Sequence, residues 1–272
     1  MLSDAATMDT HHRVFTRLNI SLLLVNYSLL KVTMSRAIVC AIALKEELYI
    51  DEWIAHNLKI GFDSVVIYDN SDDHSLVDLP DKYLGRVTVI HYPGKVRQVP
   101  AYNDALARFR ADTWCAFIDV DEFIVLRKHP DIKTLLADVA PQGGALALNW
   151  IMFGSSGREE YSPEPVTKRF TWRAREVNAH VKTIAYLPHV TAVPSPHYCN
   201  VTHTVDCHGN AVDGPFNQKK SEDVACIYHY FTKSRGEFLR KRERGRADIA
   251  EIRGLSEFAD NDINEVEDLT LA

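Results

Sequence analysis

Short apolar runs that alternate with segments of helical periodicity constrain the fold of this chain more than any other feature. The runs at residues 37–43, 64–68 and 87–91 are rich in Val and Ile, and apolar residues recur at helical spacing within residues 46–60. Strands that are apolar on both sides and alternate with helices are typical of parallel sheets covered on both faces. The pattern therefore predicts an α/β protein with a mainly parallel, doubly wound sheet and helices on both faces.

The next apolar run, residues 114–118, ends in Asp119-Val120-Asp121-Glu122. Asp119 and Asp121 are separated by one residue, so in an extended strand both side chains leave the same face and can converge on one divalent cation. Ligands of doubly wound sheets gather at the carboxyl ends of the strands, where this pair is expected to lie. Glu122 is expected on the opposite face, where it would orient the loop. An acidic strand-to-loop turn without a metal is the simpler alternative.

Other polar clusters come directly after predicted strands, at residues 45–47 and 69–73, and a His-rich loop spans residues 197–208. Together with the Asp pair they predict an acidic crevice that can bind a metal at the carboxyl edge of the sheet. Neither GxGxxG nor GxxxxGK[ST] follows the first strand, which argues against a dinucleotide-binding Rossmann enzyme and a P-loop kinase. A phosphorylated ligand would then need a metal and basic side chains. The candidates are Lys182, Lys233, Arg240, Lys241, Arg242, Arg244 and Arg246.

The composition is that of a globular protein, with 272 residues, 46% hydrophobic and 25% charged. A net charge of −6 argues against a nucleic-acid partner bound through a broad basic surface. The five cysteines are scattered and form no CxxC pair, so the sequence favours reduced thiols in the cytoplasm over a zinc knuckle or a disulfide framework.

Three segments are expected along the chain. Residues 1–34 form an N-terminal extension that is not native if Met34 is the true start, residues 35–254 form the catalytic domain, and residues 255–272 form an acidic tail that is disordered or peripheral. The apolar run at 20–32 is too short to span a membrane. Within the domain, residues 166–175 alternate like a strand and 233–252 form a basic helix.

Several motifs follow one another in a fixed order between residues 36 and 246. They are Lys45-Glu46-Glu47 with Tyr49-Ile50-Asp51-Glu52-Trp53, the acidic loop at 66–73, Gln98 with residues 101–106, Asp119-Val120-Asp121-Glu122-Phe123, and Tyr228-His229-Tyr230-Phe231-Thr232-Lys233-Ser234. This order resembles GT-A-fold glycosyltransferases of the family 2 type, and most closely the branch related to family 92. Glu46 replaces the Asn that is usual in the opening motif.

The resemblance implies a GT-A-like fold with an irregular C-terminal acceptor region. It also implies transfer of a sugar from a nucleotide-sugar donor to a glycan or lipid-linked acceptor, with inversion and with Mn²⁺ or Mg²⁺. Asp121 would hold the metal, with Asp119 directed to the metal or to the nucleotide, and with His229 or His197 completing the metal shell. The residues assigned to the nucleotide are Glu47, Asp69, Asp73, Gln98, Asn103 and Asp119.

Charge that develops on the diphosphate would be met by Lys182 or Lys233. Glu159, Glu160 and Asp213 are the candidates for the general base. The class implies a cytoplasmic location or one at the inner membrane face, and the basic segment 235–253 would supply a peripheral membrane contact. Two alternatives stay open: a nucleotidyl- or phosphotransferase, and a carbohydrate-binding protein without activity on a degenerate transferase fold.

Overall fold

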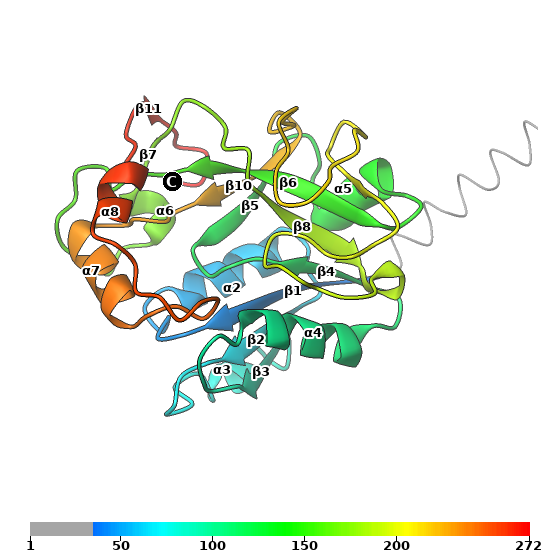
Figure 1. The fold of residues 1–272 in the computed structure, drawn as a ribbon, viewed down its shortest axis with the longest axis horizontal. Coiled ribbons are helices and arrows are strands. Elements are labelled where there is room, and N and C mark those ends of the chain that lie inside the picture. The colour runs from blue at the N-terminus through cyan, green and yellow to red at the C-terminus, as the bar shows by residue number, and fades with distance from the viewer. Residues whose placement is uncertain (1–34) are drawn as a thin grey trace, which may run out of the picture.

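A computed structural model describes residues 35–272, and its centre is one sheet with the strand order β3-β2-β1-β4-β8-β6-β10-β5 and with β9 beside β6 (Figure 1). The expectations for the N-terminal extension, the start at Met34 and the run at 20–32 lie outside the described residues. Within residues 35–272, no helix combines the length and apolar character needed to cross a bilayer.

The first half of the sheet is parallel, as predicted. β1 (Arg36–Ala43) lies between β2 (Ser64–Asp69) and β4 (Thr113–Phe117), and β3 (Val87–His91) extends the sheet beyond β2. The connections run through α2 (Ile50–Lys59), the short α3 (Leu79–Lys82) and α4 (Gln98–Phe109). The carboxyl ends of these strands therefore share one edge.

The second half of the sheet is mixed. β8 (Val181–Tyr186) runs antiparallel between β4 and β6 (Ala145–Met152), and β10 (Ala225–His229) runs parallel to β6. β5 (Glu122–Leu126) pairs with β10 in the opposite direction at the far edge. Among the described residues this sheet has five parallel and three antiparallel pairs, so it is mainly parallel. The 3₁₀ helix η1 (Leu187–His189) and β9 (Thr204–Val205) lie in the loops that follow β8.

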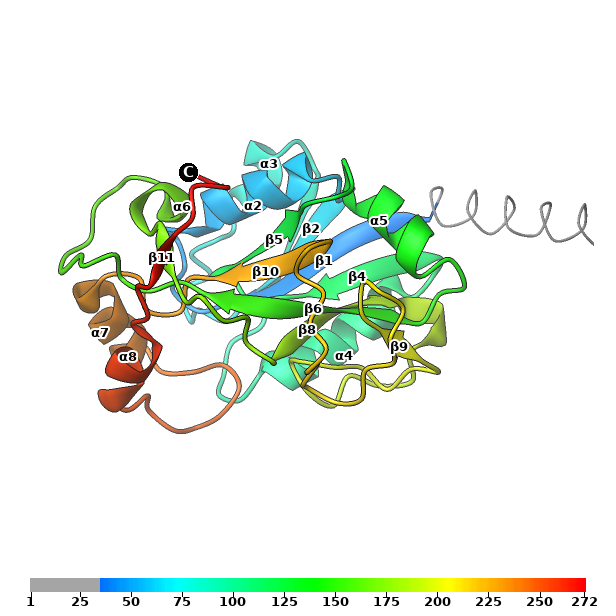
Figure 2. The same ribbon diagram turned by 90° about the horizontal axis from the view of Figure 1, so that it is seen from above.

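Helices cover both faces of the sheet (Figure 2). In β1, Val39 and Ala41 pack into the core shared with α2 and with α5 (Ile132–Val139), whereas Cys40 and Ile42 pack into the core shared with α4. This alternation is what a strand buried on both sides requires, and it explains why β1 is a continuous apolar run.

The prediction of a strand across 166–175 was wrong for its first four residues, which form α6 (Val166–Arg169). The carboxylate of Glu52, far away in the sequence, accepts hydrogen bonds from the backbone N–H of Val166 across 2.6 Å and of Thr167 across 3.0 Å. A remote side chain thus satisfies the first N–H groups of this helix, as a cap does. Only β7 (Trp172–Arg173) is extended.

The C-terminal part is packed at one end of the sheet, beyond the carboxyl end of β1 (Figure 1). The predicted basic helix is shorter than expected, because α7 (Arg235–Glu243) ends just before Gly245, which has a left-handed φ of 86°. The acidic tail, expected to be disordered or peripheral, forms α8 (Ser256–Asn261) and β11 (Val266–Glu267), and β11 pairs with β7.

Candidate active site

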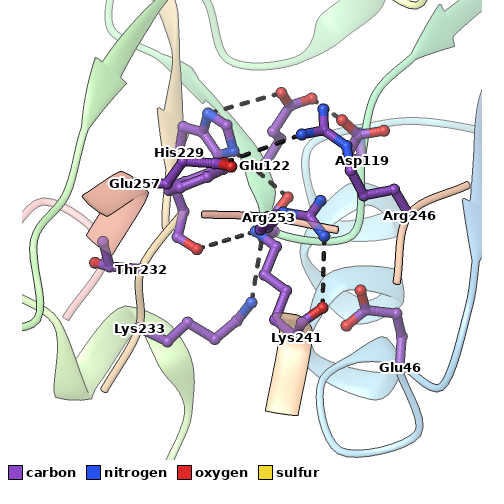
Figure 3. Close-up of polar contacts among 12 residues, drawn as sticks. Glu46, Asp119, Glu122, His229, Thr232, Lys233, Lys241, Arg246, Arg253 and Glu257 are labelled. Atoms are coloured by element: carbon purple, nitrogen blue, oxygen red, sulfur yellow. Dashed lines mark hydrogen bonds and ion pairs between the residues drawn. The ribbon is translucent and has the colours of Figure 1, made fainter. Parts of the chain in front are cut away.

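A cleft of about 160 Å³ opens at the carboxyl end of β1 and β4. The turn between β4 and β5 brings Asp119 and Asp121 into it, and β10 and α7 bring His229 and Lys241. Figure 3 shows Asp119, His229 and Lys241 gathered there from different elements. Other residues along its wall are Glu46, Gln98, Trp150, Lys182, His197, Arg244, Arg246, Asp248 and Arg253.

Asp121 is buried and is surrounded by basic side chains. Its Oδ2 accepts a hydrogen bond from Lys241 Nζ across 2.5 Å, and Lys233 Nζ lies 4.0 Å away. His229 Nε2 lies 3.6 Å from the other carboxylate oxygen, Oδ1. Burial by itself would raise the pKa of Asp121, but Lys241, His229 and Lys233 hold that pKa well below its usual range. Asp121 is therefore a carboxylate at neutral pH.

Asp119 is bound by different partners. Its Oδ1 accepts a hydrogen bond from Gln98 Nε2 across 2.6 Å, and its Oδ2 accepts one from Lys182 Nζ across 2.8 Å. Lys182 is 1% exposed and also lies 3.5 Å from Glu122 Oε2. Because its ammonium is already committed to two carboxylates, Lys182 fixes the acidic turn rather than presenting a free charge to the cleft.

Glu122 was expected on the face opposite to Asp119 and Asp121, and this prediction was wrong. Its side chain lies beneath the same turn, where Oε2 accepts a hydrogen bond from the backbone N–H of Asp119 across 2.8 Å. That contact orients the loop, as the sequence suggested. Burial raises the pKa of Glu122 well above its ordinary value. Its Oε1 lies 4.0 Å from His229 Nδ1, and neither atom has a hydrogen-bond partner among the described residues.

The protonation states of Asp121 and His229 fit a metal site. Burial lowers the pKa of His229 although the charge of Asp121 opposes this, so the imidazole is neutral. A metal needs an ionised carboxylate and a neutral imidazole, and these two face each other. Residues 35–272 contain no group of three or more His, Cys, Asp or Glu side chains placed to hold an ion. Two protein ligands suit a Mg²⁺ or Mn²⁺ ion that takes its other ligands from substrate phosphates and water.

Arginines line the C-terminal side of the cleft. The Arg244 guanidinium forms a close ion pair with Glu46 and donates a hydrogen bond to the Lys45 carbonyl oxygen across 2.8 Å. Arg246 binds Asp248 across 2.8 Å and lies 4.0 Å from Glu257. Glu46, the residue that departs from the usual opening motif, thus anchors an arginine.

His197 lines the cleft beside Trp150. Its Nδ1 lies 3.0 Å from the Val181 carbonyl oxygen, an atom that only accepts, so Nδ1 carries the proton and Nε2 keeps a lone pair. Burial and the charge of Lys182 lower the pKa of His197 to about 4. The Trp150 ring lies 5.2 Å from that of His197 and 4.4 Å from that of His229, measured between centroids. His197 is therefore a neutral imidazole that can accept a proton or bind a metal.

Several predicted nucleotide residues are not in the wall of the cleft. The carboxylate of Asp69 is fully buried and accepts hydrogen bonds from the backbone N–H of Ser71 and Leu76. The amide of Asn103 ties α4 to the backbone of Val193. Asp73 is exposed. Asp69 and Asn103 thus have structural roles here, whereas Gln98 and Asp119 lie at the cleft.

The three general-base candidates are also outside the wall of the cleft: Glu159, Glu160 and Asp213 are exposed on loops. Glu47 and Lys233 line a neighbouring cavity instead. Sequence reasoning missed Asp248 and Arg253, which lie in the cleft wall. No strand end or motif marks these two positions, because the loop after α7 brings them back to the site.

Comparison with known proteins agrees with this geometry. The sequence profile of glycosyltransferase family 92 matches residues 36–243, which include the Asp pair, His229 and Lys241. The chain belongs to glycosyltransferase family 92. A family 92 protein of Oryza sativa subsp. japonica is 26% identical over 198 residues, which are 71% of this chain and 32% of that protein. A family 92 protein of Ricinus communis is 25% identical over 155 residues, which are 52% of this chain and 27% of that protein.

This family 92 chain thus spans about a third of the length of the curated relatives it matches. Among solved structures it is similar to S. aureus TarS 1–349, with a TM-score of 0.42 and 18% identity over 76% of this chain and 64% of that one. It is also similar to the CTP:phosphocholine cytidylyltransferase LicC of Streptococcus pneumoniae, with a TM-score of 0.31 and 11% identity over 55% of this chain and 67% of that one.

Proposed function

We propose that this family 92 chain transfers a sugar from a nucleotide-sugar donor to a hydroxyl group of a glycan or lipid-linked acceptor, with inversion at the anomeric carbon. The observation that carries the proposal is the convergence of Asp119 and Asp121, from the end of β4, with the basic side chains of α7 and the loop after it. A cleft that combines carboxylates with cations suits a diphosphate and its counterion.

The donor's ribose and diphosphate would lie between Gln98 and the basic side of the cleft. Gln98 and Asp119 are hydrogen-bonded to each other, and both line the wall where a polar ligand would find donors and acceptors. Departure of the leaving group places negative charge on the diphosphate, and cations already in position stabilise that charge without reorganisation. Lys241 and Arg244 supply cations in the cleft, and Lys233 lies next to Asp121.

Mn²⁺ or Mg²⁺ is part of the proposal, with Asp121 and His229 as its protein ligands. When bound, such an ion supplies Lewis-acid stabilisation of the departing diphosphate. Asp119 remains with Lys182 and Gln98, and supports the nucleotide.

One-step inversion needs a group that accepts the proton of the acceptor hydroxyl. Since Glu159, Glu160 and Asp213 are outside the cleft wall, we propose His197 for this role. Its Nδ1 is tied to the Val181 carbonyl oxygen, which leaves the Nε2 lone pair as its proton acceptor. We further propose that the enzyme acts in the cytoplasm or at the inner membrane face. Its acceptors there would be precursors of surface polysaccharides.

The test is a panel of nucleotide sugars with Mn²⁺, in which the released product is identified. A nucleoside diphosphate indicates sugar transfer or hydrolysis, whereas pyrophosphate would indicate a nucleotidyltransferase. We expect Asp121→Asn to reduce turnover by at least about a hundredfold, because it removes the charged ligand from the site. Asp213→Asn, a similar change on an exposed loop, is the matched control. Unchanged turnover in Asp121→Asn would rule out the proposed site.

A further inference from the structure

A second cavity, of about 310 Å³, lies beside the donor cleft. It is lined by residues between 45 and 49, before and at the start of α2, and by residues between 232 and 244, in and around α7. Lys241 and Arg244 line both cavities and form the boundary between them. The proposed donor site uses Lys233, Lys241 and Arg244 from this wall but leaves Lys45 and Arg240 without a role.

The second cavity has an excess of positive charge. Five lysines or arginines and three glutamates line it. One of the glutamates, Glu237, is already neutralised by Arg169, whose two guanidinium nitrogens lie 2.8 and 2.9 Å from its oxygens. Among residues 35–272, Lys45 and Arg240 form no ion pair with a carboxylate. Lys241 and Arg244 are paired with Asp121 and Glu46, so Lys45, Lys233 and Arg240 face only Glu47 and Glu243, and positive charge remains in excess.

Lys233 is the most deeply buried of these cations. It is 3% exposed, yet its ammonium donates no hydrogen bond to any residue of the described chain. Its nearest carboxylate oxygen, Asp121 Oδ2, is 4.0 Å away, and the Tyr49 ring centroid is 4.5 Å away. Lys233 thus has a carboxylate and an aromatic ring nearby but no hydrogen-bond acceptor in the described chain, and an anion in the cavity would supply one.

The backbone adds a second, independent observation. Lys45 and Lys233 both adopt left-handed φ angles, 53° and 51°, although neither is a glycine. Such a conformation is strained for a residue with a side chain, and strained residues cluster at ligand sites. The two lysines come from segments far apart in the sequence and line the same cavity. Both of these lysines thus occupy strained backbone positions.

We propose that the second cavity binds an anionic group of the acceptor, either a phosphate or a carboxylate. This inference rests on the proposed function, because it takes the donor to occupy the cleft that contains Gln98 and Asp119. The ammonium of Lys233 lies between the cavity and Asp121, so a group bound there is adjacent to the proposed transfer centre. The enzyme thus selects acceptors by charge, and a neutral acceptor lacks the contact.

Calorimetric titration of the full chain with glucose 6-phosphate, glucuronate and glucose tests the inference. We expect at least one of the two anions to bind at least about tenfold more tightly than glucose, and the comparison between them identifies the preferred anion. The double variant Lys45→Met/Arg240→Met should weaken that binding by about tenfold or more, because charge-assisted hydrogen bonds are lost. The control Lys59→Met/Arg235→Met removes one lysine from α2 and one arginine from α7, both outside the cavity wall.

Equal binding of glucose and both anions, no binding of any of them, or unchanged anion binding in Lys45→Met/Arg240→Met would overturn the inference. Release of nucleoside diphosphate from a nucleotide-sugar panel is measured on the same proteins. Absence of that release from the unmodified enzyme would count against the proposed function, while the titration still reports on the cavity. The two failures are therefore distinguishable.

Discussion

Lys241 donates a hydrogen bond to Asp121 Oδ2 across 2.5 Å, and this contact joins residues that are 120 positions apart in the sequence. The ammonium also donates to the Phe231 carbonyl oxygen across 3.0 Å and lies 4.2 Å from the Phe231 ring centroid. Lys241 thus neutralises the carboxylate that we propose as the metal ligand. A metal on Asp121 must compete with this lysine, unless a diphosphate gives the ammonium another acceptor.

The first prediction concerns this competition. Lys241→Met should raise the affinity of the nucleotide-free enzyme for Mn²⁺ by about tenfold, because a competing cation is removed from Asp121. Titration of Mn²⁺ by electron paramagnetic resonance measures the free ion directly. Lys59→Met, on an exposed helix position, should leave the affinity unchanged. An equal or lower affinity in Lys241→Met would contradict the prediction.

The second prediction separates two buried lysines. Lys182→Met should lower the free energy of unfolding by about 2 kcal/mol, because the Asp119 carboxylate loses its charge-assisted hydrogen bond. Lys233→Met removes an ammonium that makes no hydrogen bond within the described chain, so we expect little loss of stability and about a hundredfold loss of turnover. Urea denaturation and donor turnover are measured for both variants. The reverse pattern would show that the two roles are wrongly assigned.

The third prediction concerns the attachment of α7. Arg169 and Glu237 are each 1% exposed at their side chains and are joined by two hydrogen bonds. Arg169→Met should cost about 3 to 5 kcal/mol of stability, because it leaves the Glu237 charge buried without its partner. Lys82→Met breaks an ion pair that is about half exposed and should cost at most about 1 kcal/mol. Chemical denaturation of both variants checks the contrast, and equal losses would refute it.

The fourth prediction concerns acid pH and β11. Burial would raise the pKa of Asp268, but Thr270, Arg173 and Tyr228 lower it to about 2. Because this lies below the unfolded value of about 3.9, the stabilisation is present above about pH 4 and is lost as the pH falls through about 2. The backbone N–H of Asp268, bonded to Thr171 O, should then exchange faster. Amide hydrogen-exchange rates, corrected for their intrinsic pH dependence, measure this acceleration. In Asp268→Asn the corrected rate should no longer change with pH.

The sequence was sufficient to predict the strands of the first half of the sheet and the residues at their ends. Short apolar runs specified β1, β2 and β4, which are buried on both faces, and also the partly exposed edge strand β3. The Asp pair was placed correctly at the end of β4, because the change from apolar to charged residues marks where a buried strand must end. His229 was also placed correctly at a strand end, where it meets Asp121.

Contacts between distant segments were not predictable in this way. The sequence pattern gave no sign that β8 would insert antiparallel between β4 and β6, or that Glu52 would cap α6. Glu122 was assigned to the wrong face because the chain turns between β4 and β5, and the alternation of an extended strand does not continue through a turn. The loop after α7 returns Asp248 and Arg253 to the cleft without any local signal.

The sequence by itself determined the class of the sheet, the edge at which the candidate site lies and the two carboxylates found there. These follow from hydrophobic periodicity, which each segment carries locally. The tertiary structure alone decided which cation serves which carboxylate: Lys182 serves Asp119, Lys241 serves Asp121, and Lys233 makes no hydrogen bond in the described chain. Each of these lysines could form an ion pair with either carboxylate. Only the packing of β8, β10 and α7 around the turn decides which lysine lies next to which carboxylate.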